Sequence, residues 1–147
     1  HGWVDASPGM AAITSLMRAQ AIVSRRVEVA LRPLGITFAR YEVLMLLSFS
    51  RRGSLPMSLI GARLQVHQTS VTNAVDRLEA AEYARRSPHP QDRRATIVTL
   101  TDAGRELAEK ATEVLNRDVF SRPGLGPDGV EILLGQLDAL RHDAGDF

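Results

Sequence analysis

The segment from Thr69 to Ala80 carries short polar side chains at a spacing that suits contact with nucleic-acid bases. If the segment is a helix with about 100° per residue, its apolar residues share one face: Val71, Ala74, Val75 and Leu78. The opposite face is small and polar, and it holds Thr69, Thr72, Asn73, Asp76, Arg77 and Ala80. Gln68 and Ser70 complete the candidate DNA contacts at the start of this helix.

The chemistry of this face matches the edges of base pairs. In a major groove, the Asn73 amide can pair with adenine and the Arg77 guanidinium with guanine. A threonine at position 69 or 72 suits a phosphate or a thymine methyl group. An ordinary solvated helix face is the alternative, although such a face carries Glu and Lys more often than Thr, Ser and Asn. We therefore interpret the segment as a DNA-reading helix.

A second group of candidate contacts is a cluster of arginines downstream of this helix. Arg93 and Arg94 lie in a polar loop with two prolines, and Arg85 and Arg86 precede that loop. Arginines on a protruding loop can enter an adjacent minor groove, where negative potential is concentrated. Asp92 is placed to pair with one of the arginines and to fix its direction. Arginine clusters are also common on surface loops, so the position after the reading helix is what makes this one informative.

These residues need a scaffold, and the sequence pattern predicts a mainly α fold with a small β-hairpin. Helical spacing or capping residues predict helices over 13–34, 38–50, 59–64, 69–81, 101 to before Pro123, and 128–141. We expect Thr37, Ser58 and Thr101 to act as N-caps. Residues 83–87 and 95–100 predict the two strands of the hairpin, and residues 55–57 are long enough only for an edge strand. A helix-turn-helix followed by a hairpin is a winged helix, here flanked by long helices that we expect to pack against a second copy of the chain.

Composition limits the function classes. The 147 residues carry 18 basic and 17 acidic side chains, a net charge of +1. Residues 51–94 hold eight arginines and four acidic residues, giving +4, whereas residues 101–147 hold five basic and ten acidic residues, giving −5. The absence of cysteine excludes disulfides, thiolate metal sites and a thiol redox switch, and it favours a cytoplasmic setting. No apolar run approaches the roughly 20 residues that cross a bilayer, and residues 1–5 lack signal-peptide features. We expect no membrane association.

The chain resembles the MarR family of bacterial transcription regulators. The resemblance is carried by five segments in order: 64–66, 69–72, 75–79, 92–94 and 98–104. It implies a homodimeric repressor that binds double-stranded DNA at a pseudo-palindromic operator. Residues 1–147 would form one MarR-type domain, with dimerisation helices in 1–36 and 101–147 and the winged helix-turn-helix in 37–100.

Three positions depart from the family pattern. His67 stands where Ser or Asp usually caps the reading helix, so His67 or Thr69 must take that role. Glu82 stands where glycine is usual, which predicts a strained turn into the first wing strand. Gly61 replaces the usual alanine in the first helix of the motif, at a cost of roughly 0.5–1 kcal/mol of helix stability.

The resemblance also implies a small aromatic or phenolic ligand between the dimerisation helices and the winged helix. Candidate ligand-binding residues bring aromatic surface and charge to those helices: Trp3, Met17, Arg18, Tyr41 and Glu42. For most of the apolar ones the core is the favoured alternative, and for Arg18 and Glu42 it is the surface or an ion pair. We predict no cofactor, and the four histidines show no metal-ligand spacing.

An enzyme and a winged-helix dimer with another mode of action are the two other function classes. An enzyme is disfavoured because Ser70 and Asp76 point to different sides of one helix and no glycine-rich phosphate loop is present. A winged-helix dimer that acts through protein partners, or one that binds DNA without a ligand, remains an alternative.

Overall fold

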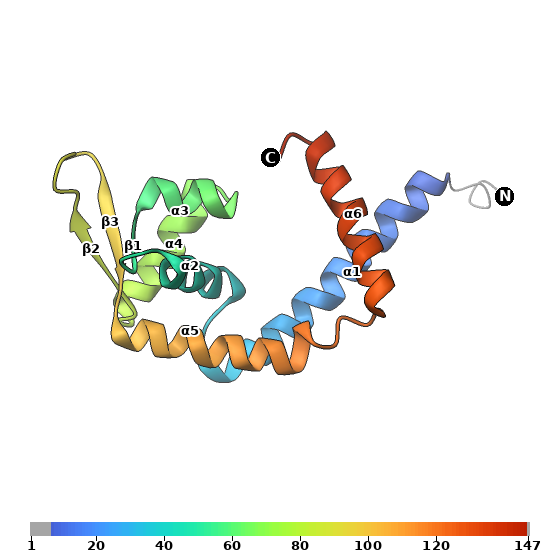
Figure 1. The fold of residues 1–147 in the computed structure, drawn as a ribbon, viewed down its shortest axis with the longest axis horizontal. Coiled ribbons are helices and arrows are strands. Elements are labelled where there is room, and N and C mark those ends of the chain that lie inside the picture. Colours follow the sequence, from blue (N-terminus) through green and yellow to red (C-terminus); the bar gives the residue numbers. More distant parts are fainter. Residues whose placement is uncertain (1–6, 147) are drawn as a thin grey trace.

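The computed structural model describes residues 7–146, so Trp3 lies outside the described residues. The elements follow in the order α1 (Pro8–Leu31), a 3-10 helix (Arg32–Leu34), α2 (Phe38–Phe49), β1 (Ser54–Pro56), α3 (Met57–Leu64), α4 (Gln68–Ala80), β2 (Ala84–Pro88), β3 (Thr96–Leu100), α5 (Asp102–Leu115), a π-helix (Asn116–Phe120) and α6 (Pro127–Asp143) (Figure 1). The mainly α prediction with a small β element is confirmed. None of the helices within residues 7–146 is long and apolar enough to span a membrane.

Side-chain caps begin several helices where the sequence predicts them. The Thr37 hydroxyl accepts from the Arg40 N–H at 3.3 Å, and the Thr101 hydroxyl accepts from the Gly104 N–H at 3.0 Å. The helix α1 starts five residues earlier than expected because Ser7 caps it and Pro8 suits its first position. The expected cap Ser58 is wrong: α3 begins at Met57, directly after β1, without a side-chain cap.

The sheet has three antiparallel strands in the order β1-β3-β2, rather than the two strands of the predicted hairpin. In register, Val98 of the central strand lies opposite Leu55 on one side and Arg86 on the other. The edge strand expected over residues 55–57 is present one residue earlier. The short strand β1 ties the wing to α3, which follows it without a break.

The core lies between α2, the helix-turn-helix, the sheet, α5 and the C-terminal end of α1. Its fully buried side chains come from every one of these elements and include Leu44, Leu47, Ile60, Val75 and Val98. Phe49, the last residue of α2, lies outside this core and is 80% exposed. In Figure 1 the N-terminal half of α1 and α6 lie on the side of the molecule opposite the wing. No residue of α6 is buried in the described chain.

The turn into the wing has the strained backbone that the sequence predicts. Glu82 adopts a φ of 62°, in the left-handed region that favours glycine. Its N–H donates to the Glu79 carbonyl at 3.0 Å, and its carbonyl accepts from the Thr101 hydroxyl at 2.8 Å. The neighbouring helix and strand therefore hold an unfavourable conformation in place.

Replacing Glu82 with glycine should raise the free energy of unfolding by about 0.5–1 kcal/mol. The removed left-handed strain exceeds the entropy that glycine adds to the unfolded chain. Chemical denaturation at a fixed protein concentration measures the change. Glu82→Ala is the matched control, because it removes the carboxylate but keeps the strain, and it should give no gain. Equal stabilisation by both variants would contradict this explanation.

Candidate nucleic-acid interface

The helix α4 presents the polar face that its sequence period predicts. Val71, Ala74, Val75 and Leu78 are buried in the core. The residues of the opposite face are all exposed: Thr69, Thr72, Asn73, Asp76, Arg77 and Ala80. Gln68 and Ser70, the two candidates at the start of the helix, are exposed as well. The candidate base-reading groups of Asn73 and Arg77 thus lie on one open surface.

His67 caps this helix. Its Nδ1 atom accepts a hydrogen bond from the Thr69 N–H at 3.2 Å. Of the two residues that the sequence offered for the cap, the structure selects His67. The Thr72 hydroxyl donates to the Gln68 carbonyl at 3.0 Å within the helix, which leaves its oxygen lone pairs facing outward.

Gly61 of α3 allows the two helices of the motif to approach closely. A Cβ atom at this position would lie 2.9 Å from the Gln68 Oε1 atom and 3.4 Å from a methyl carbon of Val71. The glycine therefore has a packing role that offsets its cost in helix propensity. It lets the start of α4 lie against α3.

The start of α2 also borders this surface, which the sequence did not indicate. Thr37, Arg40, Ser70, Asn73 and Arg77 line one hollow of about 270 Å³ between α2 and α4. The Arg40 guanidinium donates to the Thr37 hydroxyl at 3.2 Å and to the Gly35 carbonyl at 3.3 Å. Arg40 thus adds a cation beside the predicted reading face. No local signal could reveal it, because only the packing of α2 against α4 brings it there.

Arg86 and Asp76, both predicted DNA contacts, face each other. The Arg86 guanidinium forms ion pairs with Asp76 and, at 3.5 Å, with Glu79 Oε1. The Arg86 backbone N–H donates to Glu79 Oε2 at 2.8 Å. Exposed ion pairs are individually worth little, but these contacts join β2 to α4. They therefore fix the angle between the wing and the polar face.

The wing loop leaves two arginines available. Arg93 and Arg94 are exposed, and neither forms an ion pair with another residue between 7 and 146. Asp92 accepts the Arg94 backbone N–H at 2.9 Å, so it shapes the loop through the main chain. The predicted ion pair between Asp92 and an arginine side chain is absent from the described residues. In Figure 1 the loop between β2 and β3 extends beyond the rest of the fold.

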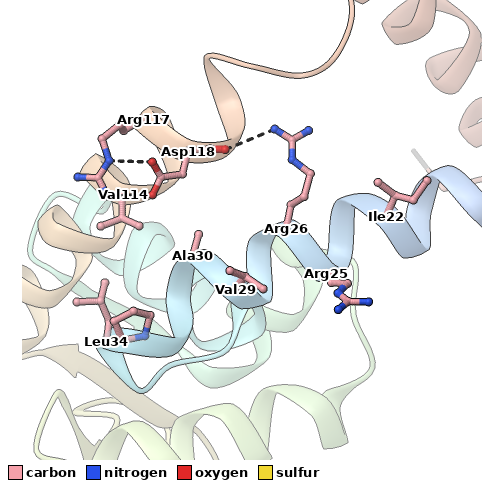
Figure 2. A pocket seen from close by; sticks show the side chains of 10 residues that line it. Ile22, Arg25, Arg26, Val29, Ala30, Leu34, Val114, Arg117 and Asp118 are labelled. Atoms are coloured by element: carbon pink, nitrogen blue, oxygen red, sulfur yellow. Dashed lines mark hydrogen bonds and ion pairs between the residues drawn. The ribbon is translucent and has the colours of Figure 1, made fainter.

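A separate cavity of about 620 Å³ lies between α1 and the end of α5 (Figure 2). Its wall is mainly apolar, with Ile22, Val29, Leu34 and Val114 among the lining residues. Four charged residues also line it: Arg25, Arg26, Arg117 and Asp118. An apolar cavity with few polar groups is typical of a small-molecule site.

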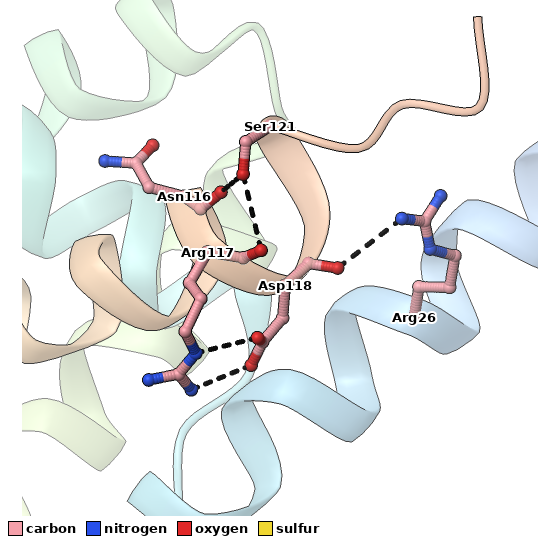
Figure 3. A network of polar contacts seen from close by, with 5 residues as sticks. All are labelled: Arg26, Asn116, Arg117, Asp118 and Ser121. Atoms are coloured by element: carbon pink, nitrogen blue, oxygen red, sulfur yellow. Dashed lines mark hydrogen bonds and ion pairs between the residues drawn. The ribbon is translucent and has the colours of Figure 1, made fainter.

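A polar network holds one side of this cavity (Figure 3). The Arg26 guanidinium of α1 donates to the Arg122 carbonyl at 2.6 Å and to the Asp118 carbonyl at 3.4 Å. Arg117 donates to both carboxylate oxygens of Asp118, at 2.8 and 2.9 Å. This hydrogen bond lowers the pKa of Asp118 and raises the pKa of Arg117. Because the π-helix turns the Asp118 carbonyl toward α1, the network ties α1 to the end of α5.

The predicted ligand-binding residues do not come together at this cavity. Met17 and Arg18 are exposed on the N-terminal half of α1. Tyr41 is buried, with its hydroxyl 3.1 Å from the Thr112 hydroxyl and its ring stacked on Phe38. Glu42 is half-buried, and burial raises the pKa of its carboxyl group. Tyr41 is therefore part of the core, the alternative that the sequence had left open.

The arrangement of the His, Asp and Glu side chains bears on metal binding. Within residues 7–146, no group of three His, Asp or Glu side chains is arranged to hold a metal ion.

Comparison with known proteins identifies relatives of this chain. The model of the MarR family matches residues 36–96. The HTH-type transcriptional regulator PecS of Dickeya dadantii is 30% identical over 125 residues, covering 80% of this chain and 73% of PecS. The chain spans about half the length of other transcriptional regulators that it matches, 53% and 50% in two cases.

Solved structures extend the likeness to nearly the whole fold. The regulator Sco5413 of the MarR family, from Streptomyces coelicolor, is 48% identical, with a TM-score of 0.85 over 95% of this chain and 97% of that protein. Sco3205, a MarR-family regulator of the same organism solved in complex with DNA, is 25% identical, with a TM-score of 0.77 over 90% of this chain and 84% of that one. The winged helix-turn-helix prediction is confirmed by these neighbours. The chain belongs to the MarR family of transcriptional regulators.

Proposed function

We propose that this protein binds double-stranded DNA as a homodimer and regulates transcription. In each subunit α4 enters a major groove, and the wing arginines Arg93 and Arg94 enter the flanking minor groove. The observation that carries the proposal is the polar, exposed face of α4 together with two wing arginines that have no ion pair in the described chain. The net charge of +4 over residues 51–94 and the DNA complex of the similar Sco3205 support it.

The role of Asn73 gives a test of sequence reading. Asn73→Ala should cost about 1–3 kcal/mol of binding energy at one base position, because the bidentate amide contact to adenine is lost. Binding measured on the preferred duplex and on a scrambled duplex separates this loss from a general one. Thr14→Ala, an exposed change on α1, is the control. An equal loss on scrambled DNA would refute the base-reading role.

The two-fold arrangement rests on the apolar surfaces of the terminal helices. Exposed apolar side chains lie along α1 and α6: Met10, Ile13, Met17, Ile22, Val23, Ile132, Leu133, Leu134 and Leu140. A surface of this size is costly in water. A second copy of the same helices would cover it, and the two α4 helices would then reach half-sites roughly 10–10.5 bp apart.

Sedimentation at micromolar concentration tests the dimer. We expect a single species of twice the chain mass, whose dissociation is promoted by Leu133→Asp because a charge is costly in an apolar interface. Leu125→Asp, which changes an exposed apolar residue outside both helices, is the control. A monomer at micromolar concentration would contradict the dimer.

We further propose that the protein is a repressor released by a small aromatic or phenolic ligand in the cavity between α1 and α5. The apolar wall and Arg25 support a ligand with a flat ring and one polar group. Release requires that the ligand binds more tightly to a dimer whose α4 helices are wrongly spaced for DNA.

Two alternatives make different predictions. A ligand-independent regulator would show no change in DNA affinity with any occupant of this cavity. A dimer acting through protein partners would bind DNA weakly and with little dependence on salt, because few phosphates would be contacted. The salt dependence of DNA binding therefore separates the second alternative from the main proposal.

A further inference from the structure

A second large cavity, of about 820 Å³, lies between the wing and the start of the helix-turn-helix. Its lining residues include Arg51 and Arg52 after α2, Leu55 in β1, Arg63 in α3, and His89, Pro90 and Gln91 in the wing loop. It shares no lining residue with the cavity between α1 and α5. It therefore needs an explanation of its own.

The charge around this cavity is uncompensated. Arg51, Arg52 and Arg63 are all exposed, and none forms an ion pair with a residue in the range 7–146. No acidic residue is among those that line the cavity. Like charges gathered around one hollow repel each other, and a bound anion would relieve that repulsion. The planar guanidinium groups suit a doubly charged oxyanion such as a phosphate, because they can donate two parallel hydrogen bonds.

The same cavity offers apolar contacts. Phe49 lines it and is 80% exposed, although Leu44 and Leu47 of the same helix are fully buried. Ile97 and Pro90 line it as well. A flat apolar group stacked on an exposed aromatic ring gains contact area and removes apolar surface from water. The lining thus combines a cationic part with an apolar part.

We propose that this cavity, at Arg51, Arg52, Arg63 and Phe49, binds a small organic dianion: a phosphate or other doubly charged oxyanion attached to a flat apolar group. The arginines hold the oxyanion, and Phe49 packs against the flat group. The hollow suits a small molecule, because arginines and apolar side chains from several elements line it together.

Binding at this site would reach the wing directly. His89, Pro90 and Gln91 precede Asp92, and the His89 N–H donates to the Ala95 carbonyl at 3.0 Å across the base of the loop. A ligand that shifts these residues would move Arg93 and Arg94. The factor by which the ligand changes the affinity for DNA must then equal the factor by which DNA changes the affinity for the ligand. Only this coupling rests on the proposed function; the binding itself does not.

Phenyl phosphate is the probe for the site, with phenol and inorganic phosphate as its two halves. In titrations of the full chain without DNA, followed by amide ¹H–¹⁵N spectra, we expect phenyl phosphate to shift Ser54, Gln91 and Ile97. It should bind at least about tenfold more tightly than either half, since both parts of the site contribute. Arg52→Gln combined with Arg63→Gln should weaken binding by about tenfold or more, because two charge-assisted contacts are lost.

Arg25→Gln, which alters the other cavity, is the matched control and should leave phenyl phosphate binding unchanged. Equal affinity for phenol, shifts centred on α1 and α5, or unaltered binding by the double variant would overturn the proposal. A further result would also overturn the proposal: the wild type binds no phenyl phosphate, and the double variant loses affinity for DNA and dependence on salt. The arginines would then be DNA contacts. The titration contains no DNA, so the absence of phenyl phosphate binding would leave the proposed function untouched. Conversely, if the protein did not bind DNA, this site could still be tested.

Discussion

Replacing Gly104 with alanine should destabilise the fold by about 3 kcal/mol or more, the largest effect expected from a single methyl group in this chain. A Cβ atom at Gly104 would lie 2.0 Å from the Tyr83 carbonyl oxygen and 2.8 Å from a methyl carbon of Leu100. The Tyr83 carbonyl also accepts the Thr101 N–H at 3.2 Å, so it cannot move away without losing the contact that anchors the start of α5. The first turn of α5 and the turn into β2 would have to separate.

Chemical denaturation at a fixed protein concentration measures this effect, because dimerisation would otherwise change the apparent stability. Gly9→Ala is the control. Its Cβ atom would meet only the Ser7 Oγ atom at an ordinary 3.8 Å, so the midpoint should stay unchanged or rise slightly. A Gly104→Ala variant as stable as the wild type would show that α5 does not pack this closely against the wing turn.

Replacing Arg94 with alanine should lower the affinity for most DNA sequences by roughly tenfold and reduce the slope of log K against log salt by about one unit. The Arg94 side chain is exposed and has no ion pair within residues 7–146, so its removal leaves no buried partner without a contact. The Asp92 hydrogen bond goes to the backbone of residue 94 and survives the substitution. The loss should therefore report on a phosphate or minor-groove contact and not on the loop's shape.

Titrations at several salt concentrations measure both quantities. Lys110→Ala removes the same charge from an exposed position on α5, outside α4 and the wing, and should leave the slope unchanged. If Arg94→Ala keeps the wild-type slope within error, the wing does not contact DNA.

Features with local causes could be predicted from the sequence. The caps at Thr37 and Thr101 and the end of the first helical segment near Gly35 depend on residues close together in the chain. The exposed face of α4 follows from a period of 3.6 residues, and the strain at Glu82 follows from a missing glycine. Each of these signals is complete within a few residues.

Features that depend on distant contacts could not be predicted. A short edge strand could be predicted near β1, but its pairing with β3 could not, because it joins residues 41 to 45 positions apart, such as Ser54 and Thr99. The contact of Arg86 with Asp76 and Glu79 fixes the wing angle, but neither acidic residue signals its partner by spacing. Arg40 reaches the α4 surface only through the packing of α2.

The candidate ligand-binding residues were the least predictable part of the proposed sites. Aromatic and charged character did not distinguish Tyr41, which packs in the core, from the residues that line either cavity. Cavity walls are formed by the ends of several elements, so their residues share no period or motif. In the sequence, Arg51, Arg52 and Arg63 stood out only through the net charge of +4 over residues 51–94.

Selection of bound duplexes from a random pool tests the central claim most directly, because it assumes no operator, ligand or regulated gene. A dimer that reads DNA through α4 should select a palindromic consensus whose half-sites are roughly 10–10.5 bp apart. The Asn73→Ala variant should relax that consensus at one position in each half-site. Enrichment of a single unrepeated site, or no enrichment above non-specific binding, would contradict a dimer that reads DNA through α4.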